Sequence, residues 1–310
     1  MARLMRNHAI TLVAILLVIA VTIGNPNFIS YFNIANILSQ WAPAALMAIG
    51  MTYVIIAGGF DLSLAAAYSF CAVVAAMVAQ EHAASIAFLA AVLAGCAIGI
   101  TNAVLIARFD VNPFITTVGT GFIVTGITFV VTGNAAFIVS DPAFSVLGAE
   151  RIYGMPYSGI LLIVAFIIAA FVLSRTVYGH LIYAVGGNAD ASRLSGIRVP
   201  IVVGSTYVLL GALTGIAGYI SASQLNSAQA NMDPNILFDV LTIVIVGGTP
   251  LGGGVGSIFR TVVGLVIIAT ISNGFVLLNI SPFYQNIIKG ALIVGALVLD
   301  SQLKKIVRAK

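Results

Sequence analysis

Charge is scarce in this chain. Its 310 residues include only 13 Lys or Arg and 9 Asp or Glu, which is 7% of the chain, whereas soluble domains carry about 25%. Hydrophobic residues make up 61%, and the mean hydropathy is +1.14. One soluble core cannot cover so much apolar surface, so the composition predicts a membrane protein. The basic residues are scattered among short loops and both ends, which argues against a nucleic-acid-binding face.

Cysteine and histidine are also rare. Cys71 and Cys96 both lie inside apolar runs, where a thiol packs as a small hydrophobic group, so we expect no disulfide. His8, His82 and His180 have no metal-ligand neighbour at helical spacing, which argues against a metal site and an intramembrane enzyme. We therefore expect no catalytic residue, no metal and no cofactor bound by this chain.

The glycine-rich stretch LGGGVGS at 251–257 lacks the Lys-Ser/Thr pair that completes a phosphate-binding loop. The chain is therefore not expected to hydrolyse ATP by that route. Any nucleotide energy must come from a partner.

Long apolar runs are abundant, and a helix that crosses about 30 Å of hydrocarbon needs roughly 20 such residues. The candidate spans are 9–24, 41–57, 62–79, 84–106, 113–132, 158–174, 200–222, 237–248, 257–279 and 284–300. We read the first as an uncleaved span, because no small-residue cleavage pattern follows it. These runs predict an all-α, polytopic membrane helix bundle with about ten spans, or eight if two short segments are re-entrant. Residues 1–310 form a single transmembrane domain.

The placement of Lys and Arg predicts the orientation, because short basic loops stay cytoplasmic. With the amino terminus inside, only Arg151 lies outside and only Lys289 lies within a span. The inner side then holds Arg3, Arg6, Arg108, Arg175, Arg193, Arg198, Arg260, Lys304, Lys305, Arg308 and Lys310. Both termini are therefore expected in the cytoplasm. The outer side receives a loop at 25–40 and a longer segment, Gly133–Tyr157, expected to fold over the outer mouth.

Two polar interruptions of the apolar runs are candidates for the translocation path or for hinges. In GGFDLS, Asp61 and Ser63 fall at the turn between two spans, where they either cap the next helix near the inner surface or line a path. In the segment 239–260, only about ten residues precede a second glycine-rich turn, too few for an ordinary crossing. This turn contains Gly247, Gly248, Thr249 and Gly253 and is read either as path wall or as a plain cytoplasmic turn.

The two glycine-rich turns resemble each other, and a Pro-Phe pair precedes a span in both NPFITTVG and SPFYQNIIKG. This weak echo suggests two related halves. Lys289, in the last span, can extend its stem towards the membrane surface, and we favour that interpretation over an ion pair.

A polar stretch, AVGGNADASRLSGIRVP, lies at 184–200. Gly186 and Gly187 are expected to break the incoming chain, Asn188 to cap a short helix, Gly196 to end it, and Pro200 to begin the next span. The cytoplasmic loop 175–199 is longer than a connection requires, which suggests a docking element. The alternative is a surface helix that only covers the inner face of the bundle.

Four ordered motifs, GMTYVIIAGGFDLS, YAVGGNADASRLSGIRV, GGTPLGGGVGS and NGFVLLNISPFYQNIIKG, carry a resemblance over roughly residues 25–300. The chain resembles the permease subunits of bacterial ABC importers of the ribose type. The resemblance implies a bacterial inner-membrane subunit that forms the path for a monosaccharide or related polar solute. It also implies three partners besides membrane lipid: an ATPase that uses ATP, a second permease subunit, identical or related, and an extracytoplasmic solute-binding protein.

The resemblance further implies that the polar stretch is the coupling helix that docks into the ATPase, chiefly through Gly187, Asn188, Ala191, Arg193, Leu194, Ser195 and Gly196. Three places depart from the family pattern: Leu237 and Phe238 before Asp239, Pro250, and LAAAYS after Ser63. They leave the solute open.

A rival interpretation is an ion-gradient-driven secondary transporter, whose ion site would need buried carboxylates. Asp61 and Asp239 are its only candidates within or beside the spans. A passive facilitator is a third interpretation.

Overall fold

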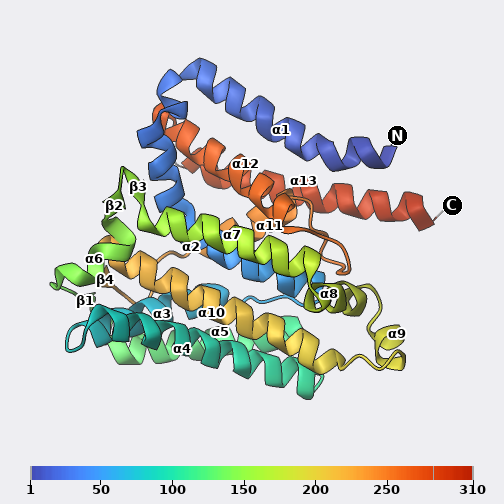
Figure 1. Cartoon of the computed structure of the whole chain (residues 1–310), viewed down its shortest axis with the longest axis horizontal. Coiled ribbons are helices and arrows are strands. Elements are labelled where there is room, and N and C mark those ends of the chain that lie inside the picture. The colour runs from blue at the N-terminus through green and yellow to red at the C-terminus, as the bar shows by residue number, and fades with distance from the viewer. Residues whose placement is uncertain (1, 282, 309–310) are drawn as a thin grey trace.

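The computed structural model describes residues 2–281 and 283–308 and is a bundle of helices (Figure 1). Its helices are α1 (Ala2–Gly24), α2 (Tyr31–Ile56), α3 (Leu64–Ala79), α4 (Ala84–Ala103), α5 (Pro113–Thr132), α6 (Pro142–Ala149), α7 (Tyr157–Arg175), α8 (Val177–Gly187), α9 (Ala189–Leu194), α10 (Val199–Leu225), α11 (Ile236–Val246), α12 (Ile258–Leu277) and α13 (Phe283–Arg308). A 3₁₀ turn, Pro26–Ile29, precedes α2, and a π-helical turn, Val104–Arg108, extends α4.

Two pairs of short antiparallel strands complete the fold. Strand β1 (Phe137–Ile138) pairs with β4 (Ser227–Ala228), and β2 (Arg151–Ile152) pairs with β3 (Met155–Pro156). The expected outer segment 133–157 is therefore folded, since it contains α6 and three of these strands.

All ten expected spans fall on helices, and the all-α class is confirmed. In the described part of the chain, six helices are long and apolar enough to cross a membrane: α2, α4 with its π-helical turn, α5, α7, α10 and α12. Shorter apolar helices cover Ile10–Gly24, Leu64–Ala79 and Ile236–Val246. At 1.5 Å per residue, the 11 residues of α11 extend only about 17 Å, about half of a bilayer core.

The expectation of an outer loop over residues 25–40 is wrong from Tyr31 onwards, where α2 begins. Ser30 caps this helix, its hydroxyl oxygen accepting a hydrogen bond from the Asn33 amide. Asn33 is buried because its side chain exchanges two hydrogen bonds with Asn273 of α12, at 2.8 and 3.1 Å. This pairing lets a polar stretch continue as helix into the bundle.

Helix α2 forms the centre of the bundle. Every residue from Trp41 to Ile56 is buried, which a helix achieves only when neighbours surround it. Helices α4 and α10 pack through glycines, and a Cβ on Gly95 or Gly211 would overlap the backbone of the other helix. Small residues allow such close backbone approach, a common way for helices to associate in membranes.

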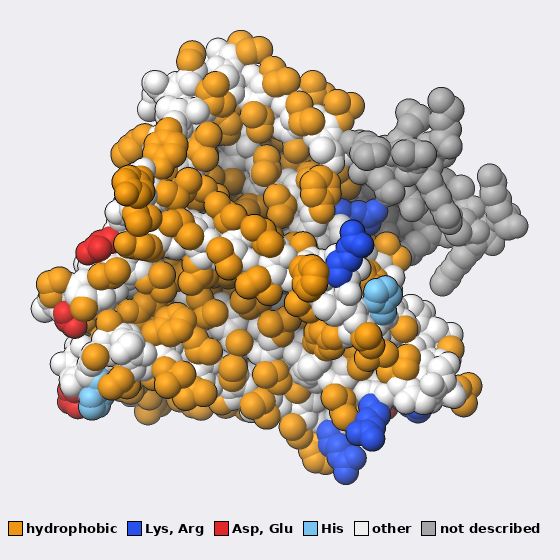
Figure 2. Space-filling model, in the orientation of Figure 1, with side chains coloured by type: hydrophobic (Ala, Val, Ile, Leu, Met, Phe, Trp, Pro, Cys, Tyr) orange, Lys and Arg blue, Asp and Glu red, His pale blue; other side chains and the backbone are white. Residues whose placement is uncertain are grey.

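The two ends of the bundle differ in charge. Both chain termini lie at the end that carries α8 and α9, and β1, β4 and α6 lie at the opposite end (Figure 1). On the face shown in Figure 2, Lys and Arg side chains gather at the α9 end, and Asp and Glu side chains at the other. Among the expected inner-side basic residues, Lys310 lies outside the described residues, as do the side chains of Arg3, Arg6, Lys304, Lys305 and Arg308.

Candidate functional site

The polar stretch forms a short, capped helix, as the sequence predicts. The Asn188 side chain accepts a hydrogen bond from the Ala191 amide at 2.9 Å and so caps the six-residue α9. At the other end, Gly196 has φ +84° and its amide donates to the Arg193 carbonyl, which closes the helix in a left-handed turn.

One face of α9 points away from the bundle and is exposed. Leu194 is 90% exposed, more than any other leucine that the structure describes. Arg193 and Asp190 form a 3.5 Å surface pair with side chains 66% and 88% exposed. Ser195 instead bonds back into the helix, with its hydroxyl donating to the Ala191 carbonyl. This face therefore offers one apolar and two charged side chains that do little within the chain itself.

The expectation that Gly186 and Gly187 break the incoming chain is confirmed in that α8 ends at Gly187, but Gly186 itself is still helical. This helix begins after Thr176, whose hydroxyl oxygen accepts a hydrogen bond from the Gly179 amide, and it ends only at Gly187. Gly186 also serves packing. A Cβ at Gly186 would overlap the Ile56 carbonyl oxygen, so only glycine allows α8 to lie directly on the end of α2.

Three glycine-containing segments meet at this point: 56–58, 186–187 and 253–254. The Gly254 amide donates to the Ile56 carbonyl at 2.8 Å, which joins the α11–α12 turn to the end of α2. A Cβ at Gly254 would lie 2.7 Å from the Gly187 Cα, and a Cβ at Gly253 would lie 3.0 Å from the Gly58 Cα. We call these three segments the glycine junction. It packs backbone on backbone, immediately before α9.

The remainder of the α11–α12 turn is anchored beside the glycine junction. The Arg260 guanidinium donates to the Gly248 carbonyl at 3.1 Å, and the Tyr183 hydroxyl of α8 donates to the Gly256 carbonyl at 2.8 Å. Gly247 packs against the backbone of α12, where a Cβ would overlap the Arg260 carbonyl oxygen. Thr249 is buried, and its hydroxyl has no hydrogen-bond partner among the described residues.

Asp61 lies in the turn between α2 and α3, as expected, and the residue is only 4% exposed. One carboxylate oxygen accepts hydrogen bonds from the Ser63 amide and hydroxyl, at 2.8 and 2.6 Å, and the other accepts from Asn102 at 3.1 Å. Ser63 occupies the N-cap position of α3, but its side chain makes no capping bond to the helix. The carboxylate is thus occupied in holding the turn and α4 together.

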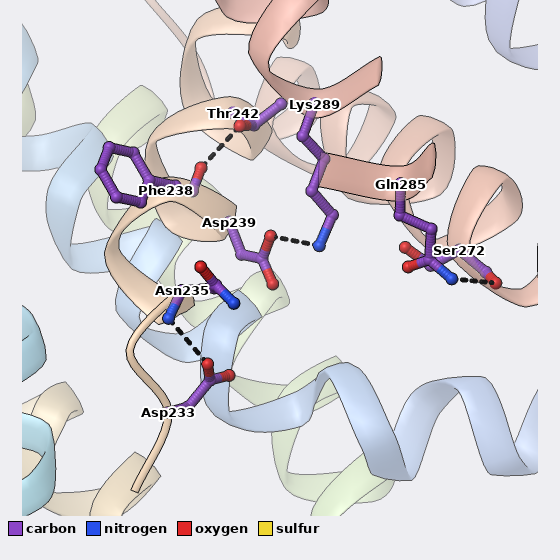
Figure 3. Close-up of polar contacts among 8 residues, drawn as sticks. All are labelled: Asp233, Asn235, Phe238, Asp239, Thr242, Ser272, Gln285 and Lys289. Carbon is purple, nitrogen blue, oxygen red and sulfur yellow. Dashed lines mark hydrogen bonds and ion pairs between the residues drawn. The ribbon is translucent and has the colours of Figure 1, made fainter. Parts of the chain in front are cut away.

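A second buried carboxylate, Asp239 of α11, forms an ion pair that corrects the interpretation of Lys289. The Lys289 Nζ lies 2.6 Å from the Asp239 carboxylate (Figure 3). It also lies 5.7 Å from the Trp41 ring centroid. Both charged side chains are largely buried, at 14% and 12% exposed. Lys289 therefore turns into the bundle and joins α13 to α11, where each charge compensates the other.

The chain before α11 is unwound inside the bundle. From Asn226 to Asn235 it runs without a helix, and the Met232 amide donates to the Ser69 hydroxyl of α3 at 3.2 Å. Ala228 and Ala230 are buried. Residues 226–246 thus consist of an extended segment followed by the short helix α11, and we call this combination a broken span. Unwound backbone at membrane depth is stable only against protein or a water-filled cavity.

These features define a polytopic membrane protein with a broken span and an exposed helix at one end, and comparison with known families assigns its class. The chain belongs to the family described as branched-chain amino acid transport system / permease component, whose model matches residues 33–297. The resemblance to the ribose-type permeases is confirmed by individual relatives.

The chain is similar to the ribose import permease protein RbsC of Bacillus subtilis, at 38% identity over 92% of this chain and 89% of that protein. RbsC of Escherichia coli K12 is 36% identical over 94% and 93% of the two chains. The galactose/methyl galactoside import permease protein MglC of Salmonella typhimurium is 32% identical over 96% and 94%. No solved structure matches the chain significantly.

Proposed function

We propose that this chain is the membrane permease subunit of an ATP-binding-cassette importer for a monosaccharide or related polar solute. The observation that carries the proposal is the exposed, capped helix α9 in a chain whose full-length relatives are sugar import permeases. The glycine junction joins the helix before α9 to the α2–α3 and α11–α12 turns. A second permease subunit, identical or related, completes the path. A separate ATPase supplies the energy, and an extracytoplasmic binding protein delivers the solute.

Helix α9 docks into the ATPase from the cytoplasmic side. The proposal is supported by the exposed Arg193, since Arg is enriched among interface anchors, and by the neighbouring Leu194, 90% exposed, whose apolar surface a partner would bury. The cap at Asn188 and the turn at Gly196 keep the helix formed before any partner arrives. A preformed helix reduces the entropy lost on docking.

Movement of α9 reaches the path through the glycine junction. Because backbone packs on backbone there, no flexible side chain absorbs a displacement of α8. The turns that receive it contain the proposed hinge or path residues: Asp61 and Ser63 in one, and Gly247, Gly248, Thr249 and Gly253 in the other. The broken span 226–246 borders the path in this proposal.

The topology follows from the basic residues and the helix ends. We place about ten crossings in the bacterial inner membrane, among membrane lipid, in a single transmembrane domain over residues 1–310. Both termini and the loop 175–199 face the cytoplasm, and β1, β4 and α6 face outwards. Support comes from the clustering of the termini, α8 and α9 at one end of the bundle.

The solute class is inferred from the relatives. Their names specify import of ribose and of galactose or methyl galactoside, and an ABC transporter for L-arabinose, and the alignments cover more than nine-tenths of this chain. The family description names branched-chain amino acids instead. We favour a monosaccharide because the full-length matches are sugar permeases.

The rival secondary transporter would need a carboxylate free to bind an ion. In the described part of the chain, the Asp61 carboxylate accepts three hydrogen bonds and the Asp239 carboxylate pairs with Lys289. Both are already compensated inside the chain, which favours the importer.

Reconstitution into vesicles tests the proposal. We expect uptake of ribose, L-arabinose or galactose only when ATP, the ATPase and the binding protein are all supplied, and no change when the proton gradient is collapsed. Uptake that persists without the ATPase, or that stops with the gradient, contradicts the proposal.

The docking of α9 has its own test in co-purification of the ATPase. Leu194→Ala removes the exposed anchor, and we expect the recovered ATPase to fall at least fivefold. Leu225→Ala is the matched control, because Leu225 is 62% exposed at the far end of α10. Equal recovery with both variants would show that α9 does not dock.

A further inference from the structure

A polar pocket lies at the end of the bundle opposite α9. It has a volume of about 390 Å³, within the range of about 300–1,000 Å³ typical of small-molecule sites. Its polar lining comes from the start of α2, from β2 and from the end of α10, and comprises Asn36, Ser39, Gln40, Arg151 and Gln224. The backbone at the end of α6, Gly148 and Ala149, completes it. We call it the α2–α10 pocket.

The α2–α10 pocket is built from a regular polar stripe on an otherwise apolar helix. Asn36, Ser39 and Gln40 stand at positions i, i+3 and i+4 of α2, which places them on one face. From Trp41 onwards the same helix is buried and almost entirely apolar. The stripe therefore ends where the packed core begins, so the pocket is a polar opening above that core.

The walls of the pocket are fixed, which preserves its shape. The Gln224 amide donates to the Ser39 carbonyl at 2.8 Å and joins α10 to α2. The Gly148 amide donates to the buried Ser223 hydroxyl at 2.9 Å, and a Cβ on Gly148 would lie 2.5 Å from the backbone nitrogen of Gln224. Only glycine allows α6 to approach α10 this closely.

Several polar groups of the pocket remain available to a ligand. Within the described residues, the Gln40 side-chain amide makes no hydrogen bond, nor do the Asn36 Nδ2 group and the Gln224 Oε1 atom. These groups offer both donors and acceptors. Such a mixed set suits hydroxyl groups, which donate and accept at once.

Arg151 adds further donors on one side of the pocket. Its guanidinium donates to the Asn36 Oδ1 atom at 2.6 Å and lies 5.4 Å from the Phe32 ring centroid, which together hold its plane. No carboxylate lies within ion-pair distance of it among the residues that the structure describes. The site therefore disfavours cationic solutes.

We propose that the α2–α10 pocket is a weak binding site for a neutral, polyhydroxylated solute of monosaccharide size. The choice of a sugar rests on the proposed function, but the pocket itself does not depend on the ATPase. Its position at the end opposite α9 places it on the outer side of the membrane in the proposed topology.

Saturation-transfer NMR on the isolated, full-length chain in lipid nanodiscs tests this site with ribose, L-arabinose and galactose as probes. No ATPase, binding protein or ATP is present, so the result is separate from that of the α9 test. We expect millimolar binding of at least one of these sugars. Absence of transfer from all three overturns the proposal.

Two pairs of variants locate the binding. Gln40→Leu should weaken it about fivefold, the factor for one neutral hydrogen bond, whereas Gln80→Leu, in the turn after α3, should not change it. Ala149→Trp should fill the pocket and abolish binding, whereas Ala143→Trp on the same helix should leave it intact. Because Gln40 and Ala149 are exposed, the variants should fold.

Three other outcomes contradict the proposal. Equal binding in Ala149→Trp and Ala143→Trp places the sugar elsewhere. Binding of inorganic phosphate but of none of the three sugars makes the site an anion site. If Ala149→Trp binds the sugars as wild type does but binds the solute-binding protein more weakly, the pocket is a protein-docking surface.

Discussion

The two ends of the bundle are built from different contacts. At the α9 end, the glycine junction brings three backbone segments together with no side chain between them. At the opposite end, the α2–α10 pocket is held by amide and guanidinium side chains that bridge helices, and it keeps about 390 Å³ of space. One end is packed and the other is open.

This difference fits a division of work between the two ends. Backbone packing has no rotamers, so a displacement at one segment must move the others. The side chains that line the pocket leave donors and acceptors unbonded, such as the Gln40 amide, and these can bond a solute without breaking the contacts between the helices. The α9 end is thus suited to transmit force, and the opposite end to receive a molecule.

The largest expected effect comes from filling the glycine junction. Gly254→Val places a Cβ where the Gly187 Cα stands 2.7 Å away, at a residue whose φ is +71°. A β-branched residue is strained at that φ whatever the space, by about 1–3 kcal/mol. We expect ATP-dependent uptake to fall below about one-tenth of wild type, because a disturbed junction cannot relay movement. Uptake in vesicles measures this.

The matched control is Gly119→Val on α5, where a Cβ would meet nothing within 4 Å. We expect it to transport normally. Gly254→Val should still insert in the membrane and bind the ATPase, since α9 itself is unchanged. Normal uptake by Gly254→Val would remove the contrast between the two ends.

A smaller effect is expected when the buried Lys289–Asp239 ion pair is broken, a contact that belongs to neither end of the bundle. Lys289→Met leaves the Asp239 carboxylate unpaired in α11, and breaking a buried pair costs about 3 kcal/mol. Asp239→Leu should lower the free energy of unfolding by less. The Lys289 side chain is longer than that of Asp239, so the unpaired ammonium group can extend to the membrane surface. Thermal unfolding in detergent micelles compares the two variants.

The double variant, Asp239→Leu with Lys289→Met, completes the comparison. We expect its stability to return to within about 1 kcal/mol of wild type, because no charge is left unpaired. Its ATP-dependent uptake should persist. Loss of uptake with full stability would favour the ion-driven rival, in which these charges bind the driving ion.

Local signals in the sequence predicted the local structure well. The ten apolar segments are all helical, and the cap at Asn188 and the stop at Gly196 are confirmed. These features depend on residues close in the chain, such as the Asn188 side chain and the Ala191 amide. The placement of Asp61 in a turn is also confirmed, for the same reason.

The sequence did not predict the contacts between residues that are far apart in the chain. Asp239 and Lys289 are 50 positions apart, and nothing local to either residue indicates the other. Likewise, Gly186 reads as a helix breaker by propensity, but tertiary packing against Ile56 keeps it helical. The early start of α2 depended on the Asn33–Asn273 pair, which spans 240 residues.

The smallest expected effect tests whether α9 must be preformed at the packed end. Asn188→Ala removes the hydrogen bond to the Ala191 amide, which is worth about 1 kcal/mol, so the ATPase should bind about fivefold more weakly. Asn188→Asp keeps a side-chain acceptor and should bind as wild type does. Surface plasmon resonance of the ATPase on immobilised permease nanodiscs measures both. If Asn188→Asp were as weak as Asn188→Ala, the amide would contact the ATPase directly, and docking would not depend on a helix that is already capped.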